Sequence, residues 1–454
     1  MGVHVNARRR LVIIGAVAAG TSAAAKARRV DQDLEVILLE RDRDISYGAC
    51  GLPYLVAGLI ARPDELVARS PAEFRAQGID VRTRHEVLAI DALNKTLRVA
   101  DLEAAKEYSL AYDNLVIATG ADSFRPPVQG LQLSGVHTLR TLSEGEALRA
   151  AVASGKIKNA VIVGGGYIGL EMAEAFRARA LTVTVVEIAP QLMVNIDEDM
   201  SKLVLAEVER RGVRVLLNDG LVRCEGAGRV EKVVTQHNEV PADLVLLSIG
   251  VRPNTSLAAE AGVALGAGRA IAVDSHMRTN LESVYAAGDC ADTVQQVTGE
   301  KVYIPLGTTA NKQGRVAGSN AAGMDCGFEG VVGTAVAKVF DLQVARTGLT
   351  EKEAKAKGFS ITVSSVHAMD HARYYPGNSA LDVKLVMDSV AGRLLGAQMV
   401  GAQGAAKRID VLAAALYARM TVDDLTRLDY SYAPAYAPVW DPTLVAANVV
   451  GRCK

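Results

Sequence analysis

The chain has 454 residues, 50% hydrophobic and 22% charged, which is the balance of a globular protein with a sizeable core and about three domains. Fifty basic and 51 acidic side chains leave a net charge of −1, so no general attraction draws the protein to nucleic acid or to an anionic membrane surface. No apolar run approaches the ~18 residues of a membrane span or forms a signal-peptide core, and we expect a cytoplasmic protein whose partners are small molecules or other proteins.

A first βαβ unit opens the chain. An apolar strand over 10–14 leads into a glycine turn, a helix runs to about Arg29, and a second strand ends at Glu40. The turn carries Gly15, Ala18 and Gly20, with Val17 in place of the middle glycine of the full pattern. In such a unit the backbone N–H groups and the helix dipole face a pyrophosphate, while the carboxylate accepts hydrogen bonds from a ribose.

The same plan returns one domain length later. A strand over 160–163 precedes a turn in which Gly164, Gly166 and Gly169 are all present, and a helix and strand then lead to Glu187. A single glycine turn is weak support for a dinucleotide site, because glycine also relieves crowding in ordinary βα turns. Strand, turn, helix and acid occurring twice predict two dinucleotide-binding domains.

The remaining pattern predicts a different third part. After a helix over about 308–322, we expect strands at 335–340, 360–366 and 381–387 and a helix over 405–417, which together indicate an α+β domain. Metal-ligand spacing is absent from the five cysteines, at positions 50, 224, 290, 326 and 453. His367 and His371 have no third ligand near, and we expect no metal site.

Cys50 lies in the segment Ser46-Tyr-Gly-Ala-Cys-Gly-Leu-Pro-Tyr54. Pro53 suits the first turn of a helix, so the sulfur is expected near a helix N-terminus, where the dipole favours thiolate over thiol. The competing interpretation of a cysteine among alanines and leucines is simple packing. Its position soon after Glu40 favours the reactive interpretation.

Two further segments, 112–120 and 279–289, complete a family pattern. Over essentially its whole length the chain resembles the pyridine nucleotide–disulfide oxidoreductases. The resemblance implies an α/β fold with two Rossmann-like domains, one binding FAD (1–113 and 254–327) and one binding NAD(P)H (114–253), followed by an α+β C-terminal dimerisation domain (328–454).

The resemblance also assigns cofactor residues. It places FAD at Gly15, Ala18, Gly20, Glu40, Ala118, Thr119, Gly120 and Asp289, and NAD(P)H at Gly164, Gly166, Tyr167, Ile168, Gly169, Glu187 and Gly250. Glu187 would repel a 2′-phosphate, and no arginine follows it closely, which favours NADH while leaving NADPH open.

Missing residues identify the branch. Dithiol members have a second cysteine five residues away, but positions 45 and 55 are Ile and Leu, and the last histidine, His371, lies too early for the His-Glu pair of those enzymes. Single-cysteine oxidases and peroxidases place a histidine where this chain has Ala18, which disfavours water formation or peroxide reduction as the main activity. The chain is most similar to coenzyme A-disulfide reductases and the related persulfide reductases.

That similarity implies further site residues. Tyr432 and Tyr374 or Tyr375 would reach Cys50 from a partner subunit in a homodimer and donate protons, although an aromatic dimer core is the simpler interpretation of the tyrosine-rich segment 430–440. CoA would be contacted by Lys26, Arg29, Ser46 and Tyr47, whereas basic residues on a helix are more often simply solvated. Ala49 departs from an asparagine seen in some relatives, which weakens the CoA assignment.

The predicted function is a flavoprotein reductase that passes electrons from NAD(P)H through FAD to Cys50, which reduces CoA disulfide. Reduction of a CoA persulfide or polysulfide is the nearest alternative. A C-terminal rhodanese domain would support it, but the sequence ends soon after the tyrosine segment and we expect none. An electron-transfer flavoprotein acting as oxidase, diaphorase or metal reductase with an incidental cysteine, and a slow redox sensor, are the alternatives of other classes.

Overall fold

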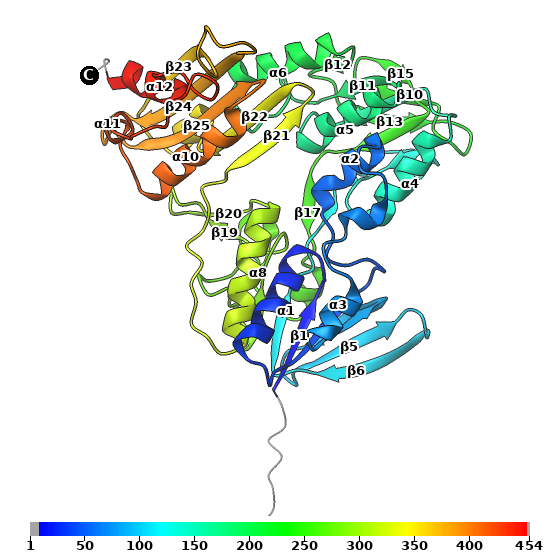
Figure 1. Ribbon diagram of the computed structural model, residues 1–454. Coiled ribbons are helices and arrows are strands. Elements are labelled where there is room, and N and C mark those ends of the chain that lie inside the picture. The colour runs from blue at the N-terminus through cyan, green and yellow to red at the C-terminus, as the bar shows by residue number, and fades with distance from the viewer. Residues whose placement is uncertain (1–8, 452–454) are drawn as a thin grey trace, which may run out of the picture.

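A computed structural model of the protein describes residues 9–451 and contains three five-stranded sheets (Figure 1). The first is parallel throughout, in the order β18-β7-β1-β2-β3. Its strands are β1 (Arg10–Ile14), β2 (Glu35–Glu40), β3 (Ile79–Thr83), β7 (Asn114–Ile117) and β18 (Val284–Ala286). Helices α1 (Ala18–Val30) and α8 (Gly307–Ala321) pack closely against each other, and β7 and β18 bring together segments far apart in the chain.

The second sheet repeats this arrangement in the order β12-β11-β10-β16-β9, again with parallel pairs. Its strands are β9 (Val136–His137), β10 (Asn159–Val163), β11 (Thr182–Val186), β12 (Arg214–Leu216) and β16 (Leu244–Leu247). Helices α4 (Leu142–Ala153), α5 (Tyr167–Ala178) and α6 (Glu198–Arg210) belong to this part. The central strands β1 and β10 are buried and apolar, as strands covered on both faces must be.

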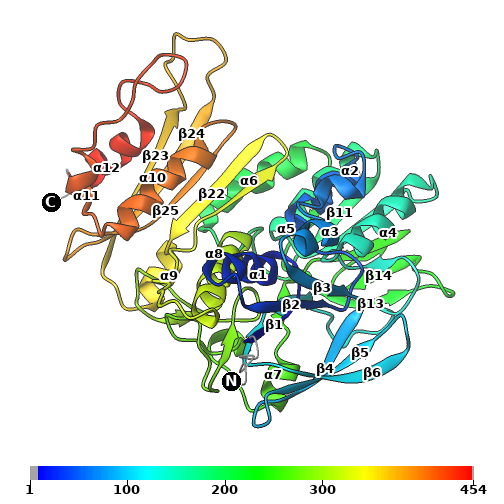
Figure 2. The same cartoon turned by 60° about the horizontal axis from the view of Figure 1, so that its bottom comes forward.

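The third sheet is antiparallel, in the order β21-β22-β25-β24-β23. Its strands are β21 (Ala335–Val339), β22 (Leu342–Gly348), β23 (Ile361–Met369), β24 (Ala380–Asp388) and β25 (Leu394–Gly401). Helix α10 (Ala405–Tyr417) packs on β22 and β25, and α12 (Pro442–Gly451) packs on β23 and β24. Figure 2 shows these elements at one end of the molecule, where β21, β22 and β25 contact α6 of the second unit.

Smaller elements complete the fold. Two three-stranded antiparallel sheets are β4 (His85–Asp91), β5 (Thr96–Asp101), β6 (Lys106–Ala111) and β13 (Leu221–Glu225), β14 (Lys232–Thr235), β15 (Glu239–Pro241). Two-stranded pairs are β8 (Ala121–Ser123) with β17 (Val251–Pro253), and β19 (Thr293–Val294) with β20 (Lys301–Val302). The short helices are η1 (Ala49–Gly51), α2 (Leu52–Ala57), η2 (Pro63–Leu66), α3 (Pro71–Ala76), α7 (Ser256–Glu260), η3 (Ala267–Arg269), α9 (Glu351–Ala356) and α11 (Val422–Leu425).

The predicted class, two Rossmann-like units followed by an α+β part, agrees with the structure. Strands β22 and β25 and the two small antiparallel sheets were not predicted from the sequence. Strand β25 is buried along its whole length, so it lacks the alternation that marks a half-exposed strand. Between residues 9 and 451, no helix is both long and apolar enough to cross a membrane.

A buried lysine joins the second and third sheets. Lys384 on β24 is only 3% exposed, and its Nζ lies 3.2 Å from Asp197 Oδ2, 2.9 Å from Asp199 Oδ1 and 3.2 Å from Glu351 Oε2. Gln398 of β25 donates to the same Asp197 carboxylate. One cation therefore neutralises acids from the start of α6 and from α9, and it fixes the third sheet against the second.

Removing this cation should destabilise the protein. In Lys384→Met, the buried Asp197 loses its ion-pair partner, and loss of one member of a buried pair costs about 3 kcal/mol or more. The midpoint of thermal unfolding, measured by calorimetry, should fall by several degrees. Lys202→Met is the matched control, because Lys202 forms only an exposed pair with Glu198 and such pairs contribute little. Equal midpoints for the two variants would contradict this role for Lys384.

Candidate active site

The two glycine turns have the same geometry. Gly15 and Gly164 have φ of +97° and +108°, and a Cβ on them would lie 2.2 Å from Ala118 O and 2.5 Å from Ser248 O. Positive φ and contact with the adjacent strand end both require glycine. A Cβ on Gly166 would meet nothing within 4 Å, so the protein itself leaves space above this turn. That space and the exposed start of α5 fit a pyrophosphate.

Both predicted acids lie at the ends of their strands and bind the turns. Glu40 accepts hydrogen bonds from the backbone N–H groups of Ala16 (2.7 Å) and Asp42 (3.0 Å). Glu187 accepts the equivalent bonds from Gly165 (2.7 Å) and Ala189 (2.8 Å). Burial is the main cause of a raised pKa at Glu40, and these N–H donors oppose it. The structure thus brings each glycine turn to its acid, as the sequence predicts.

The other predicted FAD residues gather at the same edge of the first sheet. Ala118 N–H bonds to Ile14 O beside the glycine turn, and the backbone at 119–120 is held by Asn254, whose N–H reaches Gly120 O at 2.9 Å. Thr119 Oγ1 donates to Asn254 O at 2.7 Å. Asp289 follows β18, next to β7, and its carboxylate lies at this edge. These groups fit an extended dinucleotide that runs from Glu40 toward Asp289.

Arg140, which was not predicted from the sequence, faces Asp289. Arg140 Nη2 lies 2.6 Å from Asp289 Oδ2, and its Nε donates to Ala121 O at 2.9 Å. Burial raises the pKa of both Tyr47 and Cys50, and the positive charge of Arg140 opposes this rise, so all three groups lie within electrostatic reach of one another. No motif in the chain marked this arginine, because only the fold brings it to the strand end that carries Asp289.

Cys50 lies in η1, directly before α2, and its side chain is exposed. Helix α2 packs against α4 and α5, so the cysteine faces the junction of the two parallel-sheet units. Desolvation by the surrounding protein is the largest cause of a raised Cys50 pKa, and the negative charge of Glu171 on α5 raises it further. The sequence-based expectation that the helix lowers the Cys50 pKa is therefore wrong. Helix α2 has only six residues, and the charge of Glu171 from the second unit opposes its effect.

Glu171 is a second residue that sequence reasoning missed. Burial raises its pKa to about 7, with a further contribution from Glu174. It follows Tyr167 by one helical turn, and its charge acts on Cys50, Tyr54 and Tyr167. Lys338 and the backbone N–H of Phe340 bind Glu174 instead. Glu171 therefore titrates near neutral pH beside the candidate nucleophile.

The segment before Cys50 is strained. Ser46 has φ of +51°, in a region that serine rarely adopts. Two hydrogen bonds hold it there: its N–H donates to Ala16 O at 2.8 Å, and its C=O accepts from Ala68 N–H at 2.7 Å. The half-buried Tyr47 has its pKa raised to about 12, first by burial and then by Glu40 and Asp42. Tyr47 therefore stays neutral and lies toward the Glu40 side of the site.

On the second unit, Tyr167 begins α5 and its hydroxyl accepts a hydrogen bond from Asn195 Nδ2 at 2.6 Å. Ile168 next to it is partly exposed, and Gly250, with φ of +95°, accepts a bond from Phe124 N–H. These residues lie at the carboxyl ends of β10 and β16, the edge at which open α/β sheets bind ligands.

The candidate tyrosines are not near Cys50 of the same chain. Tyr374 and Tyr432 are 75% and 47% exposed, and their hydroxyl oxygens lie 3.0 Å apart. Tyr375 instead stacks edge-on against His371, with ring centroids 5.6 Å apart. Figures 1 and 2 place the loops that follow β23 and α11 at the far end of the molecule from α2. The structure thus selects Tyr374 over Tyr375 as the partner of Tyr432.

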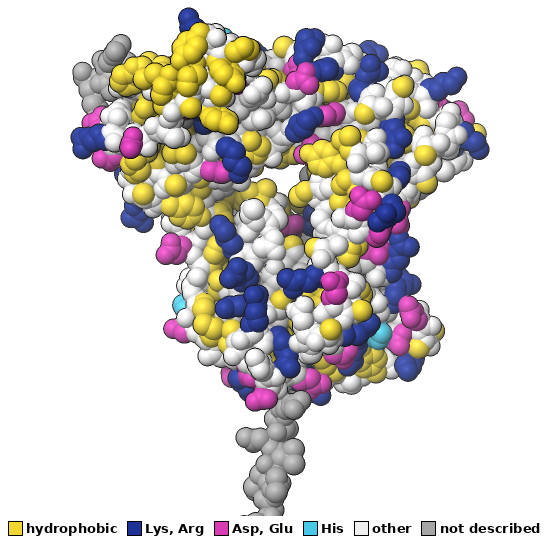
Figure 3. All heavy atoms as spheres, viewed as in Figure 1, with side chains coloured by type: hydrophobic (Ala, Val, Ile, Leu, Met, Phe, Trp, Pro, Cys, Tyr) yellow, Lys and Arg dark blue, Asp and Glu magenta, His cyan; other side chains and the backbone are white. Residues whose placement is uncertain are grey.

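Basic side chains gather over α1 and α8 (Figure 3). Among the described residues, no ion pair or side-chain hydrogen bond involves Lys26, Lys312 or Arg315, and Arg29 bonds only to Ala25 O of its own helix. Arg28 differs, because its guanidinium donates to the backbone at Gln77. The predicted Lys26 and Arg29 are therefore available to an anion, and α8 contributes two further cations beside them.

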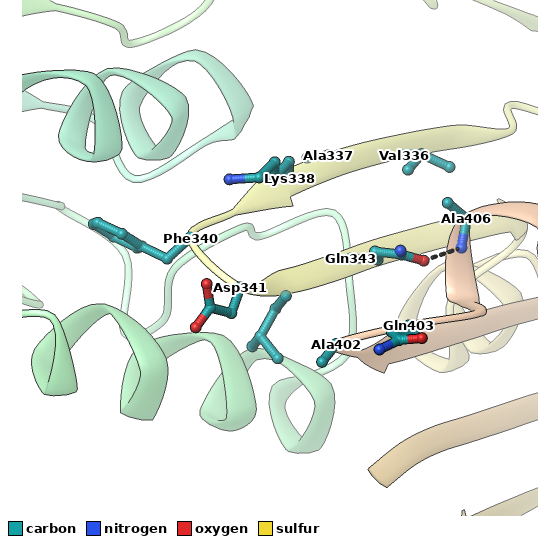
Figure 4. Close-up of a pocket in the computed structure, with 10 residues that line it drawn as sticks. Val336, Ala337, Lys338, Phe340, Asp341, Gln343, Ala402, Gln403 and Ala406 are labelled. Atoms are coloured by element: carbon teal, nitrogen blue, oxygen red, sulfur yellow. Dashed lines mark hydrogen bonds between the residues drawn. The ribbon is translucent and has the colours of Figure 1, made fainter. Parts of the chain in front are cut away.

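A pocket of about 510 Å³ lies elsewhere, beside the β21–β22 hairpin and the start of α10 (Figure 4). Its charged residues, Lys338 and Asp341, are paired with Glu174 and Arg211, and its Gln343 accepts a bond from Ala406 N–H at 2.9 Å. None of the predicted site residues lines it. All of its lining residues belong to the third part of the chain, so this pocket is not a candidate active site.

Comparison with known proteins identifies the family. Residues 9–314 match the model of the pyridine nucleotide-disulphide oxidoreductases, and residues 334–442 match the dimerisation domain of that family. An NADH oxidase of Methanocaldococcus jannaschii is 36% identical, covering 97% of this chain and 98% of its own. A coenzyme A disulfide reductase of Staphylococcus haemolyticus is 30% identical, covering 94% and 96%. A solved NAD-dependent persulfide reductase from A. fulgidus has a TM-score of 0.95 at 39% identity, covering 98% of this chain and 83% of that one.

The chain therefore belongs to the pyridine nucleotide–disulfide oxidoreductase family. It is a flavoprotein oxidoreductase that uses FAD and NAD(P)H, which confirms the family, the fold class and these two cofactors as predicted from the sequence.

Glu171 should make the reactivity of Cys50 depend on pH. Above about pH 7, Glu171 is ionised and its charge disfavours the thiolate, so Glu171→Gln should lower the Cys50 pKa and speed alkylation by iodoacetamide. Below this pH, Glu171 is already protonated and the two proteins should react alike. The control is Glu198→Gln, which alters an exposed acid on α6. A rate difference that stays constant through pH 7 would contradict this coupling.

Proposed function

We propose that this enzyme reduces the disulfide of coenzyme A at Cys50, with electrons from NAD(P)H. The observation that carries the proposal is an accessible single sulfur placed within the electrostatic reach of Asp289 and Arg140, at the end of the candidate FAD site. Among residues 9–451, Cys224 and Cys290 are buried and Cys326 is bonded into a loop through its own N–H and C=O; Cys453 lies outside the described residues. Disulfide exchange must then use the substrate's own sulfur as the second partner.

The FAD-binding residues are proposed to be Gly15, Ala18, Gly20, Glu40, Ala118, Thr119, Gly120 and Asp289, with Arg140 added by the structure. When bound, FAD supplies two-electron transfer between nicotinamide and sulfur. Glu40 holds the glycine turn and orients its carboxylate for a ribose. Asp289 and Arg140 form the far end of the site, next to Cys50.

The nicotinamide dinucleotide is proposed to bind at Gly164, Gly166, Tyr167, Ile168, Gly169, Glu187 and Gly250. The Glu187 carboxylate lies at the end of β11, where it would accept a bond from a free ribose 2′-hydroxyl and repel a 2′-phosphate. NADH is therefore the favoured donor, and NADPH the weaker one.

Cys50 acts as the nucleophile. Its thiolate attacks one sulfur of CoA disulfide, forms a mixed disulfide and releases one CoA thiolate, which takes up a proton. Two electrons then cleave the mixed disulfide, releasing the second CoA and regenerating the Cys50 thiolate. The sum is one NADH and one proton consumed for two CoA thiols formed. The Cys50 pKa is raised by burial, so the thiol would have to be ionised with the aid of groups that bind next to it.

The protons are proposed to come from the partner subunit of a homodimer. Tyr374 and Tyr432 form an exposed hydroxyl pair on the part of the chain that matches a dimerisation domain. The loops that carry them lie far from α2 of the same chain, so they could reach a Cys50 only in another subunit. A neutral tyrosine hydroxyl can donate to a leaving thiolate. Tyr375 is given a supporting role, because it packs on His371.

The phosphates of CoA are proposed to lie on Lys26 and Arg29, with the thiol arm passing Ser46 and Tyr47. Support comes from the unpaired cations on α1 and their two neighbours on α8, Lys312 and Arg315. These four positive charges suit an anion with several phosphates. Arg28 is left out of this set, because it is bound to the backbone of another segment.

Persulfide reduction is the second candidate, favoured by the higher identity to the persulfide reductase (39%) than to the CoA disulfide reductase (30%). The same attack by Cys50 on sulfur serves both reactions. Another relative is named an NADH oxidase. A reductase in which Cys50 is incidental is the remaining rival.

Replacing the cysteine separates these functions. Cys50→Ser should abolish NADH-dependent reduction of CoA disulfide, because Cys50 is the one fully exposed thiol among residues 9–451, while NADH:ferricyanide reduction continues at a rate close to that of the unchanged protein. Absorbance at 340 nm follows both reactions. Cys326→Ser is the control and should keep both activities.

Full disulfide reduction by Cys50→Ser would disprove the proposal and favour the electron-transfer rival. The intact mass of the denatured, non-reduced protein separates the two sulfur substrates. A reducible adduct of CoA mapped to Cys50 supports the first candidate, and an adduct of one to three sulfur atoms supports persulfide chemistry.

A further inference from the structure

A buried arginine lies beneath the two tyrosine loops. Arg408 belongs to α10 and its side chain is only 13% exposed. Its Nε donates to Asp441 Oδ2 at 2.7 Å, and its Nη2 donates to Asp370 O at 2.6 Å and to Tyr436 O at 3.2 Å. One guanidinium thus joins the loop that carries Tyr374 to the loop that carries Tyr432.

Each carboxylate at this junction is itself fixed. Asp441 is 4% exposed, and its second oxygen accepts bonds from the N–H (2.9 Å) and hydroxyl (2.7 Å) of Thr443 at the start of α12. Asp370 is 3% exposed and accepts bonds from His371 N–H (2.9 Å) and Ser379 N–H (2.7 Å), closing the loop between them. Such a network has few alternative arrangements, because each buried polar group would otherwise lose its partner.

The two loops also touch above the arginine. Ala372 N–H bonds to Pro434 O at 3.2 Å, and the hydroxyls of Tyr374 and Tyr432 meet at 3.0 Å. The tyrosine side chains themselves are exposed, so the contacts between the loops help to determine where the two hydroxyls lie. Two otherwise independent loops are therefore braced at their base by Arg408 and at their tip by the tyrosine pair.

We propose that Arg408 is a positioning residue that holds the Tyr374–Tyr432 pair in the geometry needed at Cys50 of the partner subunit. This inference rests on the proposed function, in which those tyrosines donate protons. Arg408 touches neither substrate nor cofactor; it acts through the loops. An arginine suits the role because its planar fork reaches three acceptors at once, whereas a lysine cannot match all three directions.

The test uses the purified FAD-containing enzyme with CoA disulfide and NADH. Arg408→Gln should lower kcat roughly 10- to 100-fold, as misplaced catalytic groups do, with little change in KM for NADH. Hydrogen exchange should become faster at Ala372 and Ser379, whose N–H groups bridge or close these loops. Arg408→Lys should recover part of kcat. The matched control is Lys407→Gln. Lys407 is the residue before Arg408, but its side chain is 89% exposed and pairs only with Asp410.

A double-variant cycle separates positioning from general stability. If Arg408 acts through Tyr432, then Arg408→Gln combined with Tyr432→Phe should be no slower than Tyr432→Phe alone. Rate losses that multiply, or unchanged exchange in Arg408→Gln, would overturn the inference. Asp441→Asn removes the same ion pair from the other side and should reproduce the result if Arg408→Gln does not fold.

Failure of the proposed function gives a different pattern. In that case Cys50→Ser and Tyr432→Phe would both retain CoA disulfide reduction, and the catalytic role of Arg408 would fall with them. If both of those variants lose activity while Arg408→Gln keeps it, only the positioning inference is overturned.

Discussion

A single sulfur constrains the rest of this active site. Among residues 9–451, Cys50 has no second thiol beside it, since positions 45 and 55 are Ile and Leu, Cys224 and Cys290 are buried, and Cys326 is bonded into a loop. In the proposed mechanism the substrate therefore supplies the second sulfur and stays attached to Cys50 between the two steps. The proposal accordingly assigns the cations on α1 and α8 to holding the attached substrate, and Tyr374 and Tyr432 of another subunit to supplying protons.

The duplicated units position this sulfur from both sides. The first unit supplies η1 and Asp289, while the second supplies Arg140 before α4 and Glu171 on α5, which packs against α2. A positive and a negative group therefore act on Cys50 from the same unit with opposite effects on its pKa. Lys384 and the tip of the β21–β22 hairpin attach the third sheet to the second unit. The part of the chain that carries Tyr374 and Tyr432 is thus fixed to the unit whose charges act on Cys50.

The sequence predicted those features of the fold that depend only on residues close together in the chain. The two turns with Glu40 and Glu187, and helix α10 over 405–417, form where the residues indicated, because glycine geometry and helical periodicity act over a few neighbours. Arg140 and Glu171 could not be found in this way, since each reaches Cys50 only through tertiary packing. The same packing makes the expected low pKa of Cys50 wrong. The pairing of Tyr374, rather than Tyr375, with Tyr432 likewise depends on two loops meeting. The domain boundaries and the roles of the site residues stay predictions.

The central claim is that each active site combines Cys50 of one subunit with Tyr432 of the other. A heterodimer of one Cys50→Ser subunit and one Tyr432→Phe subunit, purified through two different tags, tests it directly. With sites shared between subunits, one site of this heterodimer keeps both residues, and its CoA disulfide reductase activity should reach about half that of the unchanged dimer. An activity no higher than the mean of the two parent homodimers would contradict the account, because both sites would then carry a defect.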